Sequence, residues 1–405
     1  MSPLFTKTLT QIPPSLAQAP FRLAERVQAE PTTGNLPGRA FVVGGFVRDL
    51  LCGRPSTDID VEVYGIPAER LFEIATELFP GHVHEVGRQF GILHIPIEHD
   101  GTIDLALPRQ ESKEQEGHRG FSITSDPFLP LETAVRRRDF TINALLWDPL
   151  TNELIDLVNG QRDLEEKVIR IVDPAHFEED PLRVYRAIQF AARFGFTLLP
   201  ETTETLKRMV SMGELDTLSS ERVTEELKKL FLYAEKPSQG FELLRELGIV
   251  ERSYPELKTL IDTPQEPEWH PEGDVWIHTM LSLDKAAELI RVHQPPFTEE
   301  ERLQILVGTL CHDLGKPPTT HTVEKHGVKR IRSLGHQEAG DEPTQALCAR
   351  WSFSGSIIHA ARMIALNHLR PGELFIKAQK GELAEEAYAN AIRKLLKRIF
   401  PFNWK

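Results

Sequence analysis

The sequence predicts an α+β protein, in which a head of alternating strands and helices is followed by a region that is almost entirely helical. In the head, short β-branched runs such as 40–43, 59–63 and 92–97 alternate with helical stretches such as 68–78. From Leu164 onward, the apolar residues follow a helical period. The 405 residues, 40% of them hydrophobic, are sufficient for several cores.

Four segments follow from these patterns. We expect an N-terminal leader over 1–38, a head over 39–160, a helical neck and body over 161–262, and a final helical domain over 263–405. The last of these ends in a short basic C-terminus.

Composition restricts the class of protein. A net charge of −13 argues against a general nucleic-acid binder, whose surface would be basic. The three cysteines show no metal or redox spacing, and no apolar run has the length of a signal peptide or a membrane span. We therefore expect a cytoplasmic enzyme without a membrane partner.

The first strand of the head ends in a double glycine. Gly44 and Gly45 follow the run 40–43 and precede a predicted helix. Glycines at this point allow a phosphate to approach the backbone closely, and the helix that follows offers its N-terminal amides. Arg48 supplies a guanidinium that can pair with phosphate.

The next strand carries two carboxylates. Asp58 and Asp60 are two residues apart, so they project from one face of the strand. Paired carboxylates on a rigid element favour a bound cation, and their oxygens suit Mg²⁺. Asp104, on a neighbouring strand, is either a third carboxylate that deprotonates an attacking hydroxyl or a simple edge residue. Together with the glycines, this pattern predicts a nucleotidyl-transfer site. The polar stretch 108–130 is interpreted as a flexible loop over that site or as a plain surface insertion.

The helix that begins near Asp180 carries donor and acceptor groups that could recognise a nucleotide base by hydrogen bonding. Asp180 and Arg183 are three residues apart, so they can share one helical face and pair. The aspartate accepts and the arginine donates, which matches the Watson–Crick edges of C and A and mismatches those of U and G. The alternative is a helix-surface salt bridge.

Three further motifs identify a family. The runs R-R-R-D-F-T-I-N-A-L (136–145), E-E-D-P-L-R-V-Y-R (178–186) and S-E-R-V-T-E-E-L (220–227) follow the carboxylate strand in order. The series resembles the polymerase-beta-like nucleotidyltransferases, and within them the class II tRNA nucleotidyltransferases (CCA-adding enzymes) and bacterial poly(A) polymerases. It covers roughly residues 38 to 370.

The resemblance implies a set of functional residues and substrates. It implies two Mg²⁺ ions at Asp58 and Asp60, CTP and ATP as substrates, and the 3′ end of tRNA rather than DNA as acceptor. The nucleotide would be bound by Gly44, Gly45, Arg48, Arg138, Asp139, Asn143, Asp180, Arg183 and Arg186, of which Asp180 and Arg183 read the base and Arg186 holds the triphosphate.

A second constellation lies in the last domain. The adjacent pair His312–Asp313 stands among His278, His336 and His368. This pattern resembles the HD-domain metal-dependent phosphohydrolases, and imidazoles with a carboxylate suit Ni²⁺, Co²⁺ or Mn²⁺. The pattern departs from that family where a distal Asp beyond His368 is expected, and we expect relatives to continue into a tRNA-gripping tail.

Several alternatives stay open. The enzyme could add only A residues, as an A-adding enzyme or poly(A) polymerase, or only C residues. It could instead be chiefly an HD phosphohydrolase whose head binds RNA, although the Asp58–Asp60 and Asp180–Arg183 pairs argue against this. Phe400, Phe402 and Trp404, interleaved with basic residues, either contact RNA or belong to an end helix that caps the core.

Overall fold

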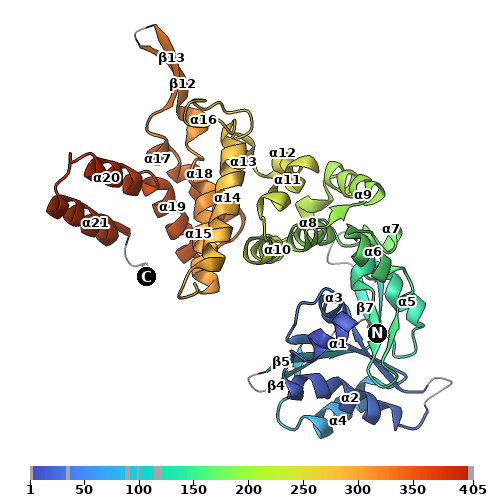
Figure 1. Cartoon of the computed structure of the whole chain (residues 1–405). Helices are drawn as coiled ribbons and strands as arrows, with labels where there is room; N and C mark the ends of the chain where they lie inside the picture. Colours follow the sequence, from blue (N-terminus) through green and yellow to red (C-terminus); the bar gives the residue numbers. More distant parts are fainter. Residues whose placement is uncertain are drawn as a thin grey trace. The chain divides into compact units, whose positions relative to one another are not determined.

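The computed structural model describes residues 3–32, 37–86, 92–97, 100–113, 121–325 and 327–399. The chain divides into two compact units, Met1–Arg183 with Thr197–Thr205 and Val184–Phe196 with Leu206–Lys405. Figure 1 traces them in sequence order from blue to red. Within the described ranges, no helix is long and apolar enough to cross a membrane.

A seven-stranded sheet forms the centre of the first unit (Figure 1). Its spatial order is β3 (His84–Val86), β4 (Ile92–Ile97), β5 (Gly101–Ala106), β2 (Asp58–Tyr64), β1 (Arg39–Val43), β8 (Leu146–Asp148) and β9 (Glu153–Ile155). Neighbouring strands are antiparallel except for β2 and β5, which run parallel. The register places Asp60 opposite Val43 on one side and opposite Asp104 on the other.

Helix α2 packs on one face of this sheet, and the opposite face carries the carboxylates of β2 beside a second hydrophobic core that contains Phe41, Val43 and Tyr64. Ile59, Val61 and Val63 are buried in one hydrophobic core with the apolar side of α2 (Pro14–Gln28). Side chains alternate along a strand, so the same pattern sends Asp58 and Asp60 to the opposite face. The other elements of this unit are α1 (Pro3–Leu9), α3 (Gly45–Leu51), α4 (Ala68–Leu78), α5 (Leu131–Arg136), η1 (Thr141–Asn143), α6 (Gly160–Glu166), β10 (Val168–Ile169), α7 (Pro174–Phe177) and β11 (Thr197–Leu198).

The stretch interpreted as a loop contains a β-hairpin instead. Strands β6 (Arg109–Lys113) and β7 (Phe121–Ser125) pair antiparallel, with Glu111 opposite Ile123. Backbone hydrogen bonds hold such a ribbon together, so the weak hydrophobic pattern of 108–130 did not predict it.

The second unit is helical apart from one hairpin. Its elements are α8 (Leu182–Phe194), α9 (Pro200–Ser211), η2 (Glu214–Thr217), α10 (Ser220–Tyr233), α11 (Ser238–Glu246), α12 (Ile249–Ser253), α13 (Pro255–Lys258), α14 (Val275–Val292), α15 (Glu299–Cys311), α16 (Lys316–Thr319), β12 (Thr320–Lys325), β13 (Val328–Ser333), α17 (His336–Ala339), α18 (Asp341–Arg350), α19 (Gly355–Asn367), α20 (Arg370–Gln379) and α21 (Glu385–Ile399). The helices α8 and α9 begin in residues of the first unit.

An aromatic cluster lies in the core of the second unit, on elements other than the helices that carry the histidines. Trp351 packs with Phe231, Phe241 and Tyr254 at ring-centroid distances of 5.3–6.4 Å. Helix α15 packs against α14 and α19 (Figure 1). A capping box fixes the start of α15, because the side chain of Thr298 accepts from a backbone N–H of the first turn.

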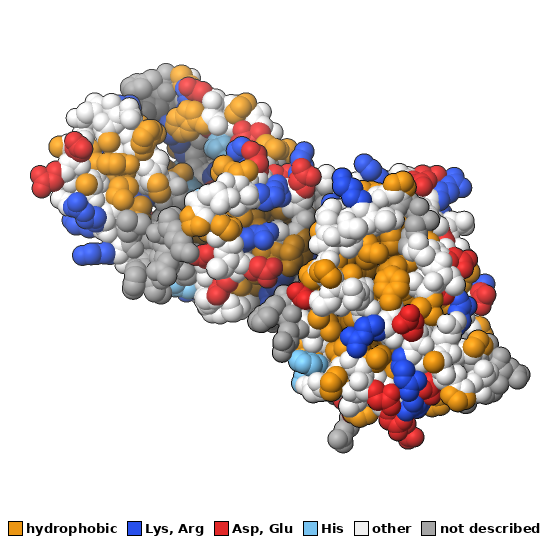
Figure 2. Space-filling model, turned by 60° about the horizontal axis from the view of Figure 1, so that its bottom comes forward, with side chains coloured by type: hydrophobic (Ala, Val, Ile, Leu, Met, Phe, Trp, Pro, Cys, Tyr) orange, Lys and Arg blue, Asp and Glu red, His pale blue; other side chains and the backbone are white. Residues whose placement is uncertain are grey.

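The predicted α+β architecture, a mixed head followed by helices, is confirmed. On the face drawn in Figure 2, acidic and basic side chains are interspersed rather than gathered by sign. The aromatic C-terminal residues Phe400, Phe402 and Trp404 lie outside the described residues.

Candidate functional site

Three carboxylates lie side by side on the head sheet. Asp58 and Asp60 project from one face of β2, and Asp104 of β5 is the cross-strand neighbour of Asp60. Thr102, opposite Asp58, donates a hydrogen bond of 2.9 Å to Asp58 Oδ1. On β4, His94 Nδ1 lies 2.6 Å from Asp104 Oδ1. The fold therefore brings together the three carboxylates that the sequence singled out.

The charges of this cluster repel one another. Asp60 is exposed to solvent at its position on β2. Desolvation is the largest cause that raises the pKa of Asp60 to about 6, and Asp104, Glu62 and Asp58 raise it further while Arg138 opposes them. A divalent cation bound by these oxygens would relieve the repulsion, so the residues present fit Mg²⁺.

Gly44 closes the site where β1 ends. Its φ of +69° lies in the left-handed region that favours glycine. A Cβ at this position would also stand 3.2 Å from Arg138 Nη1 and 3.7 Å from Asp60 Oδ2. Gly44 is therefore the glycine that lets the chain pass close to the carboxylates. Gly45 follows it with ordinary backbone geometry, and a Cβ there would meet Arg48 Nη2 at 3.4 Å.

Glu62 holds Arg138 in place. The Nη2 group of Arg138 donates to Glu62 Oε1 at 2.6 Å, and its Nη1 group donates to the carbonyl of Asn143 at 3.3 Å. The hydroxyl of Tyr64 donates to the other oxygen of Glu62 at 2.9 Å. The sequence analysis did not select Glu62, although the period of two that pairs Asp58 with Asp60 also puts Glu62 on their face.

Arg48, Asp139 and Asn143 form one buried network. Arg48 Nε donates to Asp49 Oδ1 at 2.8 Å, and its Nη1 donates to the side-chain oxygen of Asn143. The amide of Asn143 then donates to Asp139 Oδ1 at 3.0 Å. Arg48 is only 3% exposed. These residues brace the segments behind the glycines, and their contact with a nucleotide stays a prediction.

Asp180 and Arg183 lie where α8 begins, as the sequence predicts. Asp180 precedes α8, and its Oδ1 accepts from the backbone N–H of Leu182 at 3.1 Å. The guanidinium of Arg183 donates to the carbonyls of His176 at 2.6 Å and Arg137 at 2.9 Å. This contact places the aspartate side chain at the N-terminus of the helix. The two residues remain close in the chain, and their base-reading role stays a prediction.

Arg186 lies one turn further along α8, in the second unit. Its Nη1 is 3.9 Å from Glu226 Oε1, and its guanidinium lies 5.2 Å from the centre of the Phe190 ring. Its contact with a triphosphate stays a prediction.

Four imidazoles surround one buried carboxylate in the second unit. Asp313 is 1% exposed. One of its oxygens lies 3.0 Å from His312 Nε2 and 3.7 Å from His278 Nε2. The other lies 3.6 Å from His336 Nε2 and 3.7 Å from His368 Nε2. The fold therefore gathers all five predicted metal-ligand candidates.

The donor set of this cluster fits a transition metal. Nε2 of His336 and Nε2 of His368 are 3.3 Å apart. The Nδ1 atoms of both rings face main-chain carbonyls at 2.7 and 2.8 Å, so Nδ1 carries the proton and two Nε2 lone pairs face each other. Neither oxygen of buried Asp313 has a hydrogen bond of good geometry within the described residues. A cation among these atoms would satisfy the lone pairs and the carboxylate together.

The pKa values of this cluster shift in both directions: burial opposes the charged form of His312, but the adjacent Asp313 outweighs it and raises the pKa of His312. Burial and the neighbouring His312 lower the pKa of His368 to about 4, so this imidazole is neutral at neutral pH. Burial opposes ionisation of Asp313, but His312 and Lys316 outweigh it and hold the pKa of Asp313 well below its usual range. Lys316 Nζ lies 2.8 Å from Asp313 Oδ2. The sequence analysis missed Lys316, although the run H-D-L-G-K places it one helical turn after Asp313.

The distal Asp of the HD pattern has no counterpart. No Asp follows Asp341 in the sequence. The carboxylate of Asp341 accepts two hydrogen bonds of 2.7 Å from Arg362.

Three family models match the chain in succession. They describe a poly A polymerase head domain over residues 40–170, a probable RNA and SrmB-binding site of polymerase A over 195–261, and an HD domain over 275–399.

Curated relatives and solved structures agree with these matches. A multifunctional CCA protein of Dechloromonas aromatica is 40% identical over 329 residues, which are 81% of this chain and 73% of that protein. One of Methylobacillus flagellatus is 38% identical over 332 residues, 82% and 74% of the two chains. A tRNA nucleotidyltransferase solved with a primer tRNA and an incoming ATP analog has 25% identity and a TM-score of 0.60, covering 90% of this chain and 89% of its own. The Thermotoga maritima CCA-adding enzyme complexed with tRNA shares the fold at 21% identity and a TM-score of 0.59, covering 99% and 87%.

Proposed function

This chain belongs to the family of multifunctional CCA proteins, and from that membership we propose that it adds C, C and A to the 3′ end of tRNA, using CTP and ATP. The relatives carry this activity in their names, and a solved enzyme of the same fold holds a primer tRNA and an ATP analog. A nucleotidyltransferase head and an HD domain both imply dependence on divalent metal ions. We expect the reaction to take place in the cytoplasm.

The carboxylate row on the head sheet carries this proposal. Asp58 and Asp60 share one face of β2, Asp104 lies beside Asp60, and Gly44 leaves room next to them. This is the oxygen-rich, sterically open arrangement that nucleotidyl transfer requires.

Each residue of the row has its own task. When bound by Asp58 and Asp60, Mg²⁺ ions supply charge that polarises the α-phosphate and stabilises the pyrophosphate leaving group. Asp104 accepts the proton of the RNA 3′-hydroxyl. Arg138, oriented by Glu62, pairs with phosphate oxygens through its planar guanidinium.

Base selection belongs to the segment that starts α8. The guanidinium of Arg183 donates to the carbonyls of His176 and Arg137. These bonds orient the guanidinium before a nucleotide binds. Asp180 supplies acceptors and Arg183 supplies donors, so the segment selects C and A by hydrogen bonding and rejects U and G.

The test uses tRNA that lacks its last three nucleotides. CTP alone should extend it by two residues, ATP alone should add nothing at this end, and the two together should restore C-C-A. Other products would overturn the proposal. Long A tracts would indicate a poly(A) polymerase, addition of A alone an A-adding enzyme, and a stop after C-C with both nucleotides present an enzyme that adds only C residues. Sequencing of the product ends reads all of these outcomes.

The HD region supports a second activity, metal-dependent phosphoester hydrolysis. The observation that favours it is the buried Asp313 carboxylate without well-placed hydrogen bonds among four imidazoles. The site would hold Ni²⁺, Co²⁺ or Mn²⁺ through His278, His312, Asp313, His336 and His368, and the bound ion would supply an activated water. Stimulation of 2′,3′-cyclic phosphate hydrolysis by these ions, and its loss with a chelator, tests this activity.

A further inference from the structure

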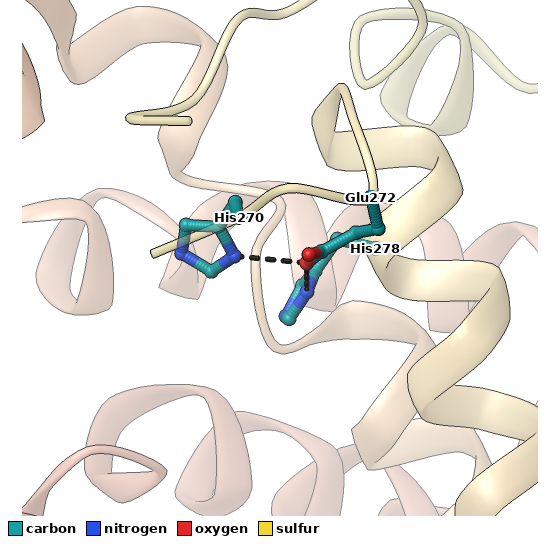
Figure 3. A group of neighbouring side chains, drawn as sticks. All are labelled: His270, Glu272 and His278. Carbon is teal, nitrogen blue, oxygen red and sulfur yellow. Dashed lines mark hydrogen bonds and ion pairs between the residues drawn. The ribbon is translucent and has the colours of Figure 1, made fainter. Parts of the chain in front are cut away.

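One carboxylate outside the HD cluster contacts one of its histidines. Glu272, in the segment that precedes α14, accepts a hydrogen bond from His278 Nδ1 at 2.7 Å on its Oε1 atom. The same oxygen accepts from His270 Nδ1 at 3.0 Å. Figure 3 shows both imidazoles aimed at this carboxylate from different sides.

The other three histidines of the cluster are oriented by main-chain carbonyls. Their Nδ1 atoms face the carbonyl three residues earlier, at 2.6 Å for His312, 2.7 Å for His336 and 2.8 Å for His368. His312 and His368 are the C-cap residues of α15 and α19, where helix carbonyls lack partners within the helix. His336 follows the end of β13.

His278 occupies a position where this arrangement is not possible. It lies in the first turn of α14, whose carbonyls accept the N–H groups of the helix itself. The Val275 carbonyl, three residues earlier, also accepts from the Thr279 hydroxyl at 2.8 Å. A side chain must therefore fix the ring of His278, and Glu272 is the acceptor that does so.

A chain of hydrogen bonds also connects the segment that contains Glu272 to the carboxylate of Asp313. Gln265 Nε2 donates to the carbonyls of Gly273 and Asp274 at 3.3 and 3.1 Å. Its Oε1 accepts from Lys316 Nζ at 2.7 Å, and that ammonium lies 2.8 Å from Asp313 Oδ2. The segment is thus fixed relative to Asp313 independently of His278.

We propose that Glu272 is the positioning residue of the HD metal site, where it takes the place of the main-chain carbonyl that orients each of the other histidines. Since an ionised carboxylate only accepts, it keeps the proton of His278 on Nδ1 and turns the Nε2 lone pair toward Asp313. The inference rests on the proposed metal-dependent activity of this region. It concerns the affinity of the site for its ion rather than the chemical step.

Metal binding by the purified, metal-stripped full chain tests this role. Titration with Co²⁺, followed by its visible absorption, should show that Glu272→Ala weakens binding by about 10–100-fold, the usual effect of losing such a partner. Glu272→Gln keeps an oxygen acceptor at the same place, so its affinity should lie closer to that of the wild type. Glu268→Ala is the matched control, because Glu268 lies in the same segment and pairs with Arg330 instead.

A double variant separates positioning from a general structural effect. In a His278→Ala background, adding Glu272→Ala should not weaken Co²⁺ binding further, since the residue acts through His278. A further loss there, or wild-type affinity in Glu272→Ala alone, would overturn the role of Glu272. If the wild type bound none of the ions, the metal site itself would be wrong, and the inference would fall with it.

Discussion

The contact between Glu62 and Arg138 gives a quantitative prediction for the head. The Glu62 side chain is 20% exposed and that of Arg138 18%, and the donor–acceptor distance is 2.6 Å. A hydrogen bond to a charged group is worth about 1.5–3 kcal/mol. Glu62→Ala leaves Arg138 without this hydrogen bond. If the transition state loses the same amount of stabilisation, kcat/KM for CTP and ATP falls by about 10- to 150-fold.

The assay is single-nucleotide addition to a tRNA acceptor. Saturating Mg²⁺ is used so that a change in metal affinity does not affect the measured kcat/KM. Glu62→Gln, which keeps an oxygen acceptor, should lose less activity than Glu62→Ala. Glu69→Ala, an exposed carboxylate in the first turn of α4, is the control and should stay close to wild type. Combining Glu62→Ala with Arg138→Ala should be no worse than Arg138→Ala alone. Activity of Glu62→Ala within about threefold of wild type would refute the reasoning.

Three further sets of variants test the remaining roles. Asp60→Ala should leave less than about a tenth of wild-type nucleotide addition while tRNA binding persists, because it removes a metal ligand from a solvent-accessible face; higher turnover would exclude that ligand role. Asp180→Ala or Arg183→Ala should change the ratios of kcat/KM among the four nucleotides, whereas an equal fall for all four would show that the pair only supports the helix. His312→Ala with Asp313→Ala should abolish Ni²⁺-, Co²⁺- or Mn²⁺-stimulated hydrolysis and leave CTP and ATP incorporation within about threefold of wild type; loss of incorporation in the folded variant would show that the HD region supports the polymerase site.

The carboxylate pair of the head was predictable because it depends on local periodicity, whereas the histidine cluster, whose members lie far apart in the chain, was predicted from its resemblance to HD domains. Two carboxylates two residues apart on a strand must share a face, and this holds in any sheet that the strand joins. Asp104 was expected on a neighbouring strand, and the register opposite Asp60 comes from the structure. Glu62 could have been found from the same alternation as the two aspartates.

Other features depend on tertiary contacts that no spacing reveals. Arg183 bonds to carbonyls of His176 and Arg137, because the chain folds back on itself before α8. Glu272 contacts His278 only because the turn before α14 brings it back toward the helix. The strands β6 and β7 consist mostly of polar residues, so their sequence resembles a loop.

One competition experiment tests the central claim most directly. A tRNA without its three terminal nucleotides is incubated with all four nucleoside triphosphates at equal concentration, and the product ends are sequenced. The account predicts that C-C-A is added, that extension then stops, and that U and G are absent. Failure to extend the acceptor, incorporation of U or G at rates similar to C and A, or continued addition of A would contradict it.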